Sequence, residues 1–282
     1  MANKNETAAV PKAKYARLDE LDRPIHRIFP LWLFEEALRI KCLTFVQPSL
    51  WEDPFEDPCV HVMVQRNGAQ KELAPHLRQA WAQCWSYEAD SDVLLRAYSQ
   101  VDLHPLANRN RDPAREGVRV TTTTRKLLRQ VADWQKENPK DHFYAGRVMY
   151  EPSDNYPAGL ADVLAKYGEA FFETADGRAE SLWRKRAMFQ HEDEVRLLCI
   201  GPDRHGQGDR IKRLSFDPNS LFNEVAFDPR LALFERRERE AAARALGYNG
   251  TFLERGEYVK PIFLCVIPDG AEALNDETSD NR

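Results

Sequence analysis

The chain has 282 residues, of which 43% are hydrophobic and 30% charged, with a formal net charge of −5. This composition is typical of a soluble globular protein with a substantial core, and its charge excludes a global positive field that attracts nucleic acid. No stretch reaches the roughly 20 apolar residues of a membrane-spanning helix, and residues 1–13 lack the apolar segment of a signal peptide, so we expect a cytoplasmic protein without membrane contact.

The hydrophobic pattern predicts a series of short elements. In chain order these are a strand at 24–29, a helix at 31–40, strands at 43–46 and 82–86 with a helix at 73–80 between them, a helix opening at 92, a strand at 117–121, a helix holding 127–134, a strand at 143–150, helices at 160–173 and 180–189, strands at 195–200, 210–216 and 223–227, a helix at 229–246 and a strand at 259–267. Their irregular alternation favours an α+β fold with a mixed sheet over a doubly wound sheet. Because no Gly-, Ser- or Pro-rich linker divides the chain, we predict a single α+β domain at 23–268 between flexible tails at 1–22 and 269–282.

The cysteines and histidines predict no metal site. Five cysteines, an odd number without a closely spaced pair, favour neither structural disulfides nor zinc. The seven histidines are dispersed, and His26 and His61 lie beside apolar strands, where histidine is usually a core residue. The sequence also lacks a Gly-rich phosphate loop, a Gly-x-Ser-x-Gly elbow and a His-Glu-x-x-His helix.

The run at 185–200 carries charge into the start of an apolar strand. Alternation along a strand puts Glu192, Glu194 and Arg196 on one face, with the two carboxylates about 7 Å apart. If water is excluded, one carboxylate raises the pKa of the other, and the ionised one could hold a substrate hydroxyl. The alternative is a solvated face on which Glu194 pairs with Arg196 or Arg186, an interaction worth under about 1 kcal/mol.

Arg27 is the complementary candidate, because a guanidinium flanked by Ile25, Ile28 and Phe29 needs an anionic partner if it is buried. A pyrophosphate fits its planar fork. An internal carboxylate would serve equally well, and Glu56 or Asp53 could supply it.

Aromatic and hydroxyl side chains at the ends of strands form a second group of candidates. The proline-rich loop at 48–56 carries Trp51 and Phe55, whose rings either stack on a planar base or fill the core. Trp85 and Ser86 end a strand, where the hydroxyl bonds either a ligand or the next turn. The arginines of a loop at 103–116, together with Arg119, offer phosphate contacts to a nucleic acid.

With these segments identified, the sequence resembles a bacterial family catalogued as domain of unknown function 2971. The matching pieces cover most of residues 24–267. They are HRIF at 26–29, LTFVQPSLWEDPFE at 43–56, CWS at 84–86, the helix of Tyr98, GVRV at 117–120 and KRxxFxHExEVR at 185–196.

The order of an early arginine, a serine at a strand end and a late Glu-x-Glu pair is also similar to the arginine-serine-glutamate class of ADP-ribosyltransferases. That resemblance implies a mixed, mostly antiparallel split sheet flanked by helices and NAD as the substrate. It also implies roles for individual residues: Arg27 on the pyrophosphate, Ser49 or Ser86 supporting the site, Glu194 on the ribose 2′-hydroxyl and Glu192 orienting a protein or nucleic-acid acceptor.

Three functions remain open at this point. The first is an NAD-using transferase or NAD-cleaving enzyme, such as a toxin or defence effector, whose cleft is formed by Arg27, the loop at 49–56, Trp85, Ser86, Tyr98 and Glu194. The second is a nucleic-acid-binding protein that uses the basic loop around Arg109–Arg119. The third is a noncatalytic interaction module in which these charges are structural ion pairs.

Overall fold

The computed structural model describes residues 15–152, 156–254, 258 and 262–266. The strands are β1 Tyr15–Ala16, β2 Pro24–Pro30, β3 Cys42–Val46, β4 Met63–Arg66, β5 Ala69–Glu72, β6 Arg78–Ser86, β7 Gly117–Thr123, β8 His142–Arg147, β9 Met149–Glu151, β10 Arg184–Arg186, β11 Glu194–Arg204, β12 Ile211–Ser215, β13 Glu224–Phe227 and β14 Thr251–Phe252. The helices are α1 Leu31–Ile40, α2 Asp92–Tyr98, α3 Thr124–Glu137, α4 Tyr156–Tyr167, α5 Ala175–Ser181, α6 Pro218–Leu221 and α7 Leu233–Ala245.

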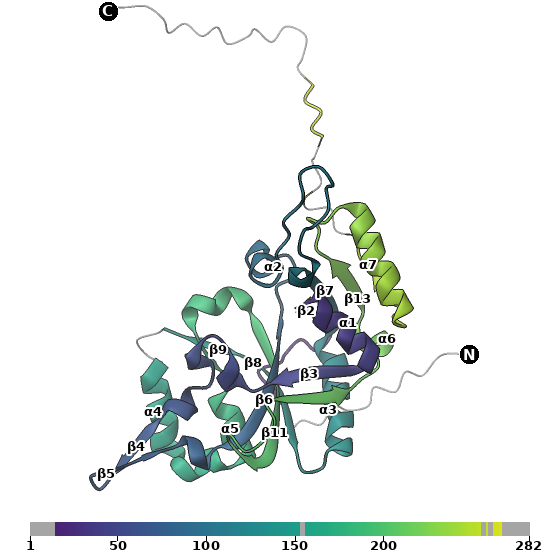
Figure 1. The fold of residues 1–282 in the computed structure, drawn as a ribbon. Coiled ribbons are helices and arrows are strands. Elements are labelled where there is room, and N and C mark those ends of the chain that lie inside the picture. The colour runs from purple at the N-terminus through teal and green to yellow at the C-terminus, as the bar shows by residue number, and fades with distance from the viewer. Residues whose placement is uncertain (1–14, 153–155, 255–257, 259–261, 267–282) are drawn as a thin grey trace, which may run out of the picture.

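One 10-stranded sheet organises the molecule, in the order β1-β8-β11-β6-β2-β7-β13-β14, with β3 joined to β6 and β12 joined to β3. Most neighbours in it are antiparallel, and β1–β8 and β13–β14 are parallel pairs. Helices flank the sheet, with α3 on one side of its central strands and α5 on the other (Figure 1). The predicted α+β fold with a mixed, mostly antiparallel sheet is therefore confirmed.

The sheet splits beside β6. β2 touches β6 through one register pair, His26 with Ser86, and β3 touches it through another, Val46 with Ala82. Between these two points β6 lacks a continuous neighbour on that edge, because α1 separates the strands that would supply one. The backbone of Cys84 lies in this gap, and this is the feature that positions the candidate site.

The central strand β11 is buried on both faces. Leu197 and Cys199 belong to the main core with Trp134 of α3, whereas Leu198 and Ile200 pack in a second cluster with α5. A strand covered on both sides reads as a continuous apolar run, which agrees with the sequence after residue 196. Because alternation puts Glu194 and Arg196 on the same face as Leu198, their charges lie under α5 and β10 instead of in solvent.

Several predicted elements were wrong in type or extent. The predicted helix at 73–80 is only a 3-10 turn at Ala74–His76 followed by β6, because Pro75 restricts the residue before it and the following residues are buried as a strand. The predicted helix at 180–189 ends at Ser181, and β10 follows. The predicted helix at 160–173 breaks at Gly168, whose φ of +75° ends α4. Of the predicted strand at 259–267, residues 262–266 are described and form no strand, and the others lie outside the described residues.

The described chain begins at residue 15, inside the predicted tail at 1–22, and Tyr15–Ala16 pairs with β8 as β1. Residues 1–14 and the predicted tail at 269–282 lie outside the described residues. None of the helices in the described part is long and apolar enough to cross a membrane.

Candidate functional site

The acidic pair lies at the start of β11, but not on one strand face as predicted. Glu192 ends a 3-10 turn at Ala187–Glu192, and Asp193 adopts a left-handed φ of 39°, so β11 begins at Glu194. Strand alternation therefore does not apply to Glu192. The two carboxylates nevertheless converge, because both accept hydrogen bonds from Lys185 of β10, at 2.7 Å for Glu192 and 3.1 Å for Glu194.

Five charged side chains form what we call the Lys185 cluster: Lys185, Arg196, Glu56, Glu192 and Glu194. The Lys185 Nζ also lies 2.7 Å from Glu56 Oε1, and Arg196 contacts Glu56 Oε2 at 2.5 Å. Arg196 donates from Nε to Glu194 Oε1 at 2.8 Å and from Nη2 to Oε2 at 3.1 Å. Two cations thus face three carboxylates, and the cluster carries a formal charge of −1.

Burial and pairing fix the ionisation of these groups. Burial of the Glu194 carboxyl opposes its ionisation, but Arg196 and Lys185 outweigh burial and lower its pKa to about 2. Burial raises the pKa of Glu192, against the lowering effect of Lys185, and Glu194 and Glu56 raise it further as like charges. The pKa of Lys185 is raised because the three carboxylates outweigh the cost of burying the ammonium.

The side chain of Glu194 is 2% exposed, whereas that of Glu192 is 14% exposed. Both oxygens of Glu194 already accept hydrogen bonds from Arg196, and one also accepts from Lys185. The predicted alternative, in which Glu194 pairs with Arg196, describes the contact correctly, but the pair is buried instead of solvated. Glu192 is the carboxylate with more room for a ligand.

The proline-rich loop covers the cluster. The ring of Trp51 lies 4.9 Å from the Arg196 guanidinium, and the ring of Phe55 lies 4.6 Å from that of Arg186. Arg186 also pairs with Asp53 at 2.9 Å, while Ser49 is exposed on the same loop. The loop therefore packs Trp51 on Arg196, a cation of the cluster, and Phe55 on Arg186, which pairs with the loop's own Asp53.

Arg27 lies at the gap in the sheet. Its Nη1 donates to the backbone carbonyl of Cys84 at 2.5 Å, at the position where β6 lacks a neighbouring strand. Its Nε is buried without a hydrogen-bond partner, and no carboxylate of the described residues lies within ion-pair distance of it. Burial lowers its pKa, and Glu194 is among the charges that oppose this shift. The predicted internal partners do not pair with it, because Glu56 pairs with Lys185 and Arg196, and Asp53 pairs with Arg186.

Tyr98, at the end of α2, belongs to the same surroundings. The residue is 52% exposed. Partial burial of the phenol raises its pKa, and the negative charges of Glu192 and Cys84 add to the shift. Burial and Glu194 also raise the pKa of the Cys84 thiol. The structure thus brings Arg27, Tyr98, Glu192 and Glu194 into one electrostatic environment.

Ser86 and Trp85, both at the end of β6, have different surroundings. The Ser86 hydroxyl donates to the backbone carbonyl of Glu192 and accepts from the Glu88 N–H at 2.9 Å. In register, Ser86 pairs with Glu194 on one side and His26 on the other. Trp85 is 2% exposed, packs edge-on to Phe29 and donates from Nε1 to Gln83 at 3.0 Å, so its ring is part of the core.

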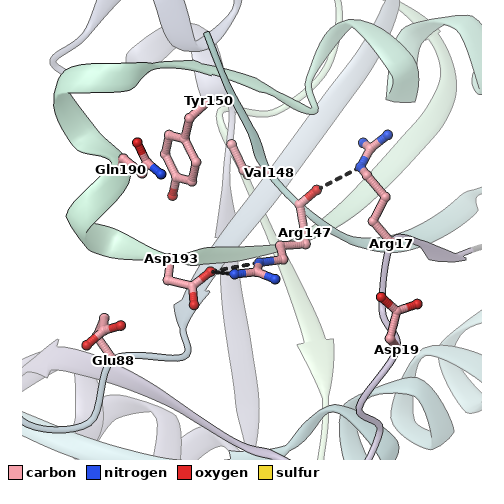
Figure 2. Close-up of a pocket in the computed structure, with 8 residues that line it drawn as sticks. All are labelled: Arg17, Asp19, Glu88, Arg147, Val148, Tyr150, Gln190 and Asp193. Carbon is pink, nitrogen blue, oxygen red and sulfur yellow. Dashed lines mark hydrogen bonds and ion pairs between the residues drawn. The ribbon is translucent and has the colours of Figure 1, made fainter.

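A cavity of about 450 Å³ is lined in part by Asp193, the residue between Glu192 and Glu194 in the sequence (Figure 2). It is lined by Arg17, Asp19, Glu88, Arg147, Val148, Tyr150, Gln190 and Asp193. The Tyr150 hydroxyl accepts the Glu194 N–H at 2.8 Å, which connects the cavity wall to the start of β11. Arg147 pairs with Asp193 across the cavity at 2.6 Å (Figure 2). The volume lies in the range of small-molecule sites.

The basic loop does not present a row of unpaired charges. Arg109 forms a two-pronged ion pair with Glu238, and Arg111 contacts Asp102. Arg119 is buried and donates to the Ala89 carbonyl. The prediction that this loop binds nucleic acid receives no support from these contacts.

The residues described contain no group of three or more His, Cys, Asp or Glu side chains that could hold a metal ion.

Sequence reasoning missed Lys185 and Tyr150 as members of the site. Both lie on short strands that pair with each other. Tyr150 of β9 ends the predicted strand at 143–150, whereas Lys185 of β10 falls within the segment predicted as a helix at 180–189. The only signal in the sequence was the proximity of Lys185 to the acid pair. One of its three carboxylate partners, Glu56, lies 129 positions earlier in the chain, and the other two follow Lys185 within a few residues. No local sequence pattern therefore reveals the whole cluster.

No family model matches the sequence, so the resemblance to the domain of unknown function 2971 is not confirmed, and no curated protein is significantly similar. Three structures of DarT from Thermus sp. 2.9 show a weak likeness. The complex with ADP-ribosylated ssDNA is 11% identical, covers 86% of this chain and 97% of its own, and gives a TM-score of 0.37. The complex with carba-NAD+ is 11% identical over 83% and 96%, with a TM-score of 0.34, and the complex with NAD+ is 8% identical over 85% and 98%, with a TM-score of 0.31. A likeness at this level does not establish a shared family.

Proposed function

We propose that the protein is an NAD-using transferase of the ADP-ribosyltransferase type, which passes ADP-ribose to an acceptor or to water. The observation that carries the proposal is Arg27, a partly buried arginine whose Nε is buried without a hydrogen-bond partner and whose guanidinium has no carboxylate partner among the described residues. Even partial burial of an unpaired cation is costly, and a diphosphate would supply the missing charge and hydrogen bonds. In NAD a ribose adjoins the diphosphate, and the Lys185 cluster would supply negative charge beside that ribose.

In the proposed reaction the bond between ribose C1′ and the nicotinamide nitrogen breaks, and the bonding electrons leave with nicotinamide. Positive charge then develops on the ribose ring. A preorganised anionic site lowers this barrier electrostatically, and the Lys185 cluster carries a formal charge of −1. The acceptor oxygen or nitrogen then forms the new bond to C1′ and releases a proton.

The geometry favours a division of roles between the acids. Glu192, the more exposed carboxylate, would contact the ribose or the acceptor. Glu194, whose oxygens are held by Arg196 and Lys185, would not contact the substrate but would act as a fixed negative charge near it. The adjoining cavity, walled by Tyr150 and Gln190, would provide space for an acceptor to approach.

The test combines NAD binding, measured by calorimetry, with nicotinamide release. We expect Arg27→Met to weaken NAD binding at least about tenfold, since a charge-assisted hydrogen bond is worth about 1.5–3 kcal/mol. We expect Glu192→Gln to bind NAD nearly as wild type does but to release nicotinamide about 100-fold more slowly. Arg125→Met, which removes an exposed pair with Asp22, is the matched control and should change neither quantity.

Three results would overturn the proposal. The first is the absence of saturable NAD binding by the wild type. The second is equal binding by the wild type and Arg27→Met, because Arg27 would then not be the phosphate residue. Nicotinamide release into water requires no acceptor, so a wild type that binds NAD but never cleaves it also counts against the reaction.

A further inference from the structure

Lys185 is the cation on which Glu192 depends. Arg196 contacts Glu56 and Glu194, but Lys185 is the only cation of the described residues within ion-pair distance of Glu192. Its Nζ lies 2.7 Å from Glu192 Oε2, 2.7 Å from Glu56 and 3.1 Å from Glu194. An ammonium has three N–H donors, so Lys185 can give one to each carboxylate.

We propose that Lys185 is a positioning residue for the reaction, which holds the Glu192 carboxylate as an anion beside Glu194 and directs it toward the substrate. This inference rests on the proposed function, because it concerns the same acids. It adds to that function the residue that keeps the Glu192 carboxylate ionised and in place. Lys185 itself is 6% exposed and contacts the substrate in no step.

Position and charge both support this role. Lys185 lies on β10, which pairs with β9 through Tyr150, and the Phe189 ring lies 4.9 Å from its Nζ. The ammonium is therefore held between a strand and a ring, with little freedom to move. A carboxylate paired with this ammonium, such as that of Glu192, is therefore held in a fixed position before the substrate binds, as preorganisation requires.

Loss of Lys185 would affect the acids unequally. Glu194 and Glu56 would keep Arg196 as a partner, whereas Glu192 would keep none and would face two like charges. Like charges disfavour the ionised form, so Glu192 would take up a proton at a higher pH. The titratable and charged groups that face Glu192 are Glu56 from the proline-rich loop, Lys185 from β10, Glu194 from β11, Tyr98 from α2 and Tyr150 from β9.

The test is an NMR titration of the glutamate carboxyl carbons, in which the Glu192 signal is assigned by its loss in Glu192→Gln. In Lys185→Met we expect the Glu192 pKa to rise by at least about one unit. We expect the acid limb of the pH profile of nicotinamide release to move up equally, with kcat falling and KM for NAD changing little. Glu56→Gln removes a like charge but keeps Lys185, and should move the Glu192 pKa in the opposite direction.

A second variant allows for a Lys185→Met protein that fails to fold. The double variant Lys185→Met/Glu56→Gln keeps the formal charge of the cluster at −1 but still leaves Glu192 without its cation. We expect it to remain defective in nicotinamide release. Lys136→Met, which removes an exposed lysine on α3 paired with Asp133, is the surface control and should behave as wild type.

The outcomes separate this inference from the proposed function. Unchanged Glu192 pKa and unchanged release in both Lys185 variants would overturn the role of Lys185 while NAD cleavage stands. Full activity in the double variant would also overturn it, because net charge alone would then matter. A raised Glu192 pKa in a protein that never cleaves NAD would overturn the proposed function, and with it any catalytic role for Lys185.

Discussion

The guanidinium of Arg27 caps the backbone carbonyl of Cys84 at 2.5 Å, in the gap that opens between β2 and β3 on the edge of β6. A continuous sheet would satisfy this carbonyl with a backbone N–H. Here a side chain does so, and the rest of its donor capacity remains available. The split in the sheet and the candidate phosphate site therefore have one structural origin.

Removal of Arg27 should cost less stability than removal of Arg196. We expect Arg27→Met to lower the free energy of unfolding by about 1–3 kcal/mol, because the Cys84 carbonyl loses its hydrogen-bond donor but no buried carboxylate loses its partner. Arg196→Met leaves Glu56 and Glu194 short of a cation, and breaking a buried pair in this way costs about 3–5 kcal/mol. Urea unfolding at pH 7 checks both values. A loss in Arg27→Met as large as that in Arg196→Met would show that Arg27 has a structural partner besides the Cys84 carbonyl.

Glu194→Gln should destabilise the protein in a pH-dependent way. The pKa of Glu194 is lowered to about 2 in the folded protein, below the value of about 4.3 in an unfolded chain. Its ionised form therefore stabilises the fold above about pH 4.3, and this contribution disappears as the pH falls through the folded value. We expect a loss of about 3 kcal/mol at pH 7 and at pH 5, shrinking below pH 4.

Unfolding by urea at pH 7, 5, 4 and 3 measures this difference. The matched control is Glu238→Gln, which removes an exposed carboxylate paired with Arg109 and should have little effect at any of these pH values. A difference between wild type and Glu194→Gln that stays constant down to pH 3 would contradict the assignment of Glu194 as the ionised acid.

Ser86→Ala should loosen the turn that carries Glu192. The variant loses the hydrogen bond to the Glu192 carbonyl and the one from the Glu88 N–H, and we expect a loss of about 1–2 kcal/mol of stability. Because the hydroxyl fixes the backbone at Glu192, nicotinamide release should fall more than NAD affinity does. Thermal unfolding, calorimetry and the release assay measure these effects. An NAD affinity that falls as much as the rate would instead indicate that Ser86 contacts the ligand.

A second buried ion pair should matter for stability alone. Arg178 of α5 donates to Asp57 at 2.6 and 2.5 Å, and both residues are almost fully buried. Asp57 directly follows Glu56 of the Lys185 cluster, but its carboxylate pairs with Arg178 instead. We expect Asp57→Asn to cost about 3–5 kcal/mol of unfolding free energy, since Arg178 loses its carboxylate partner. NAD binding per folded molecule should not change. Chemical unfolding and calorimetry below the unfolding midpoint check this, and weakened NAD binding by folded Asp57→Asn would contradict it.

Much of the local structure could be predicted because it depends on local patterns. Leu31, Phe34, Ala37 and Leu38 share one face of α1, and Ser91 and Thr123 cap α2 and α3, as the sequence indicates. The pattern failed at 73–80 and at 180–189, where short turns and strands replace helices. Such short elements are stabilised by distant neighbours, and β10 is an example because its partner β9 lies more than 30 residues earlier.

The sequence by itself determined that charged residues enter the start of β11 and that an arginine stands in an early apolar strand, because residue type and alternation follow directly from the chain. Only the tertiary structure decided which cation meets which acid. Electrostatic pairing depends on distance in space, and Glu56, Lys185 and Arg196 meet across as many as 140 positions of sequence. The same reason explains why Trp85 is in the core, why Arg109 is neutralised by Glu238, and why the buried Nε of Arg27 has no hydrogen-bond partner.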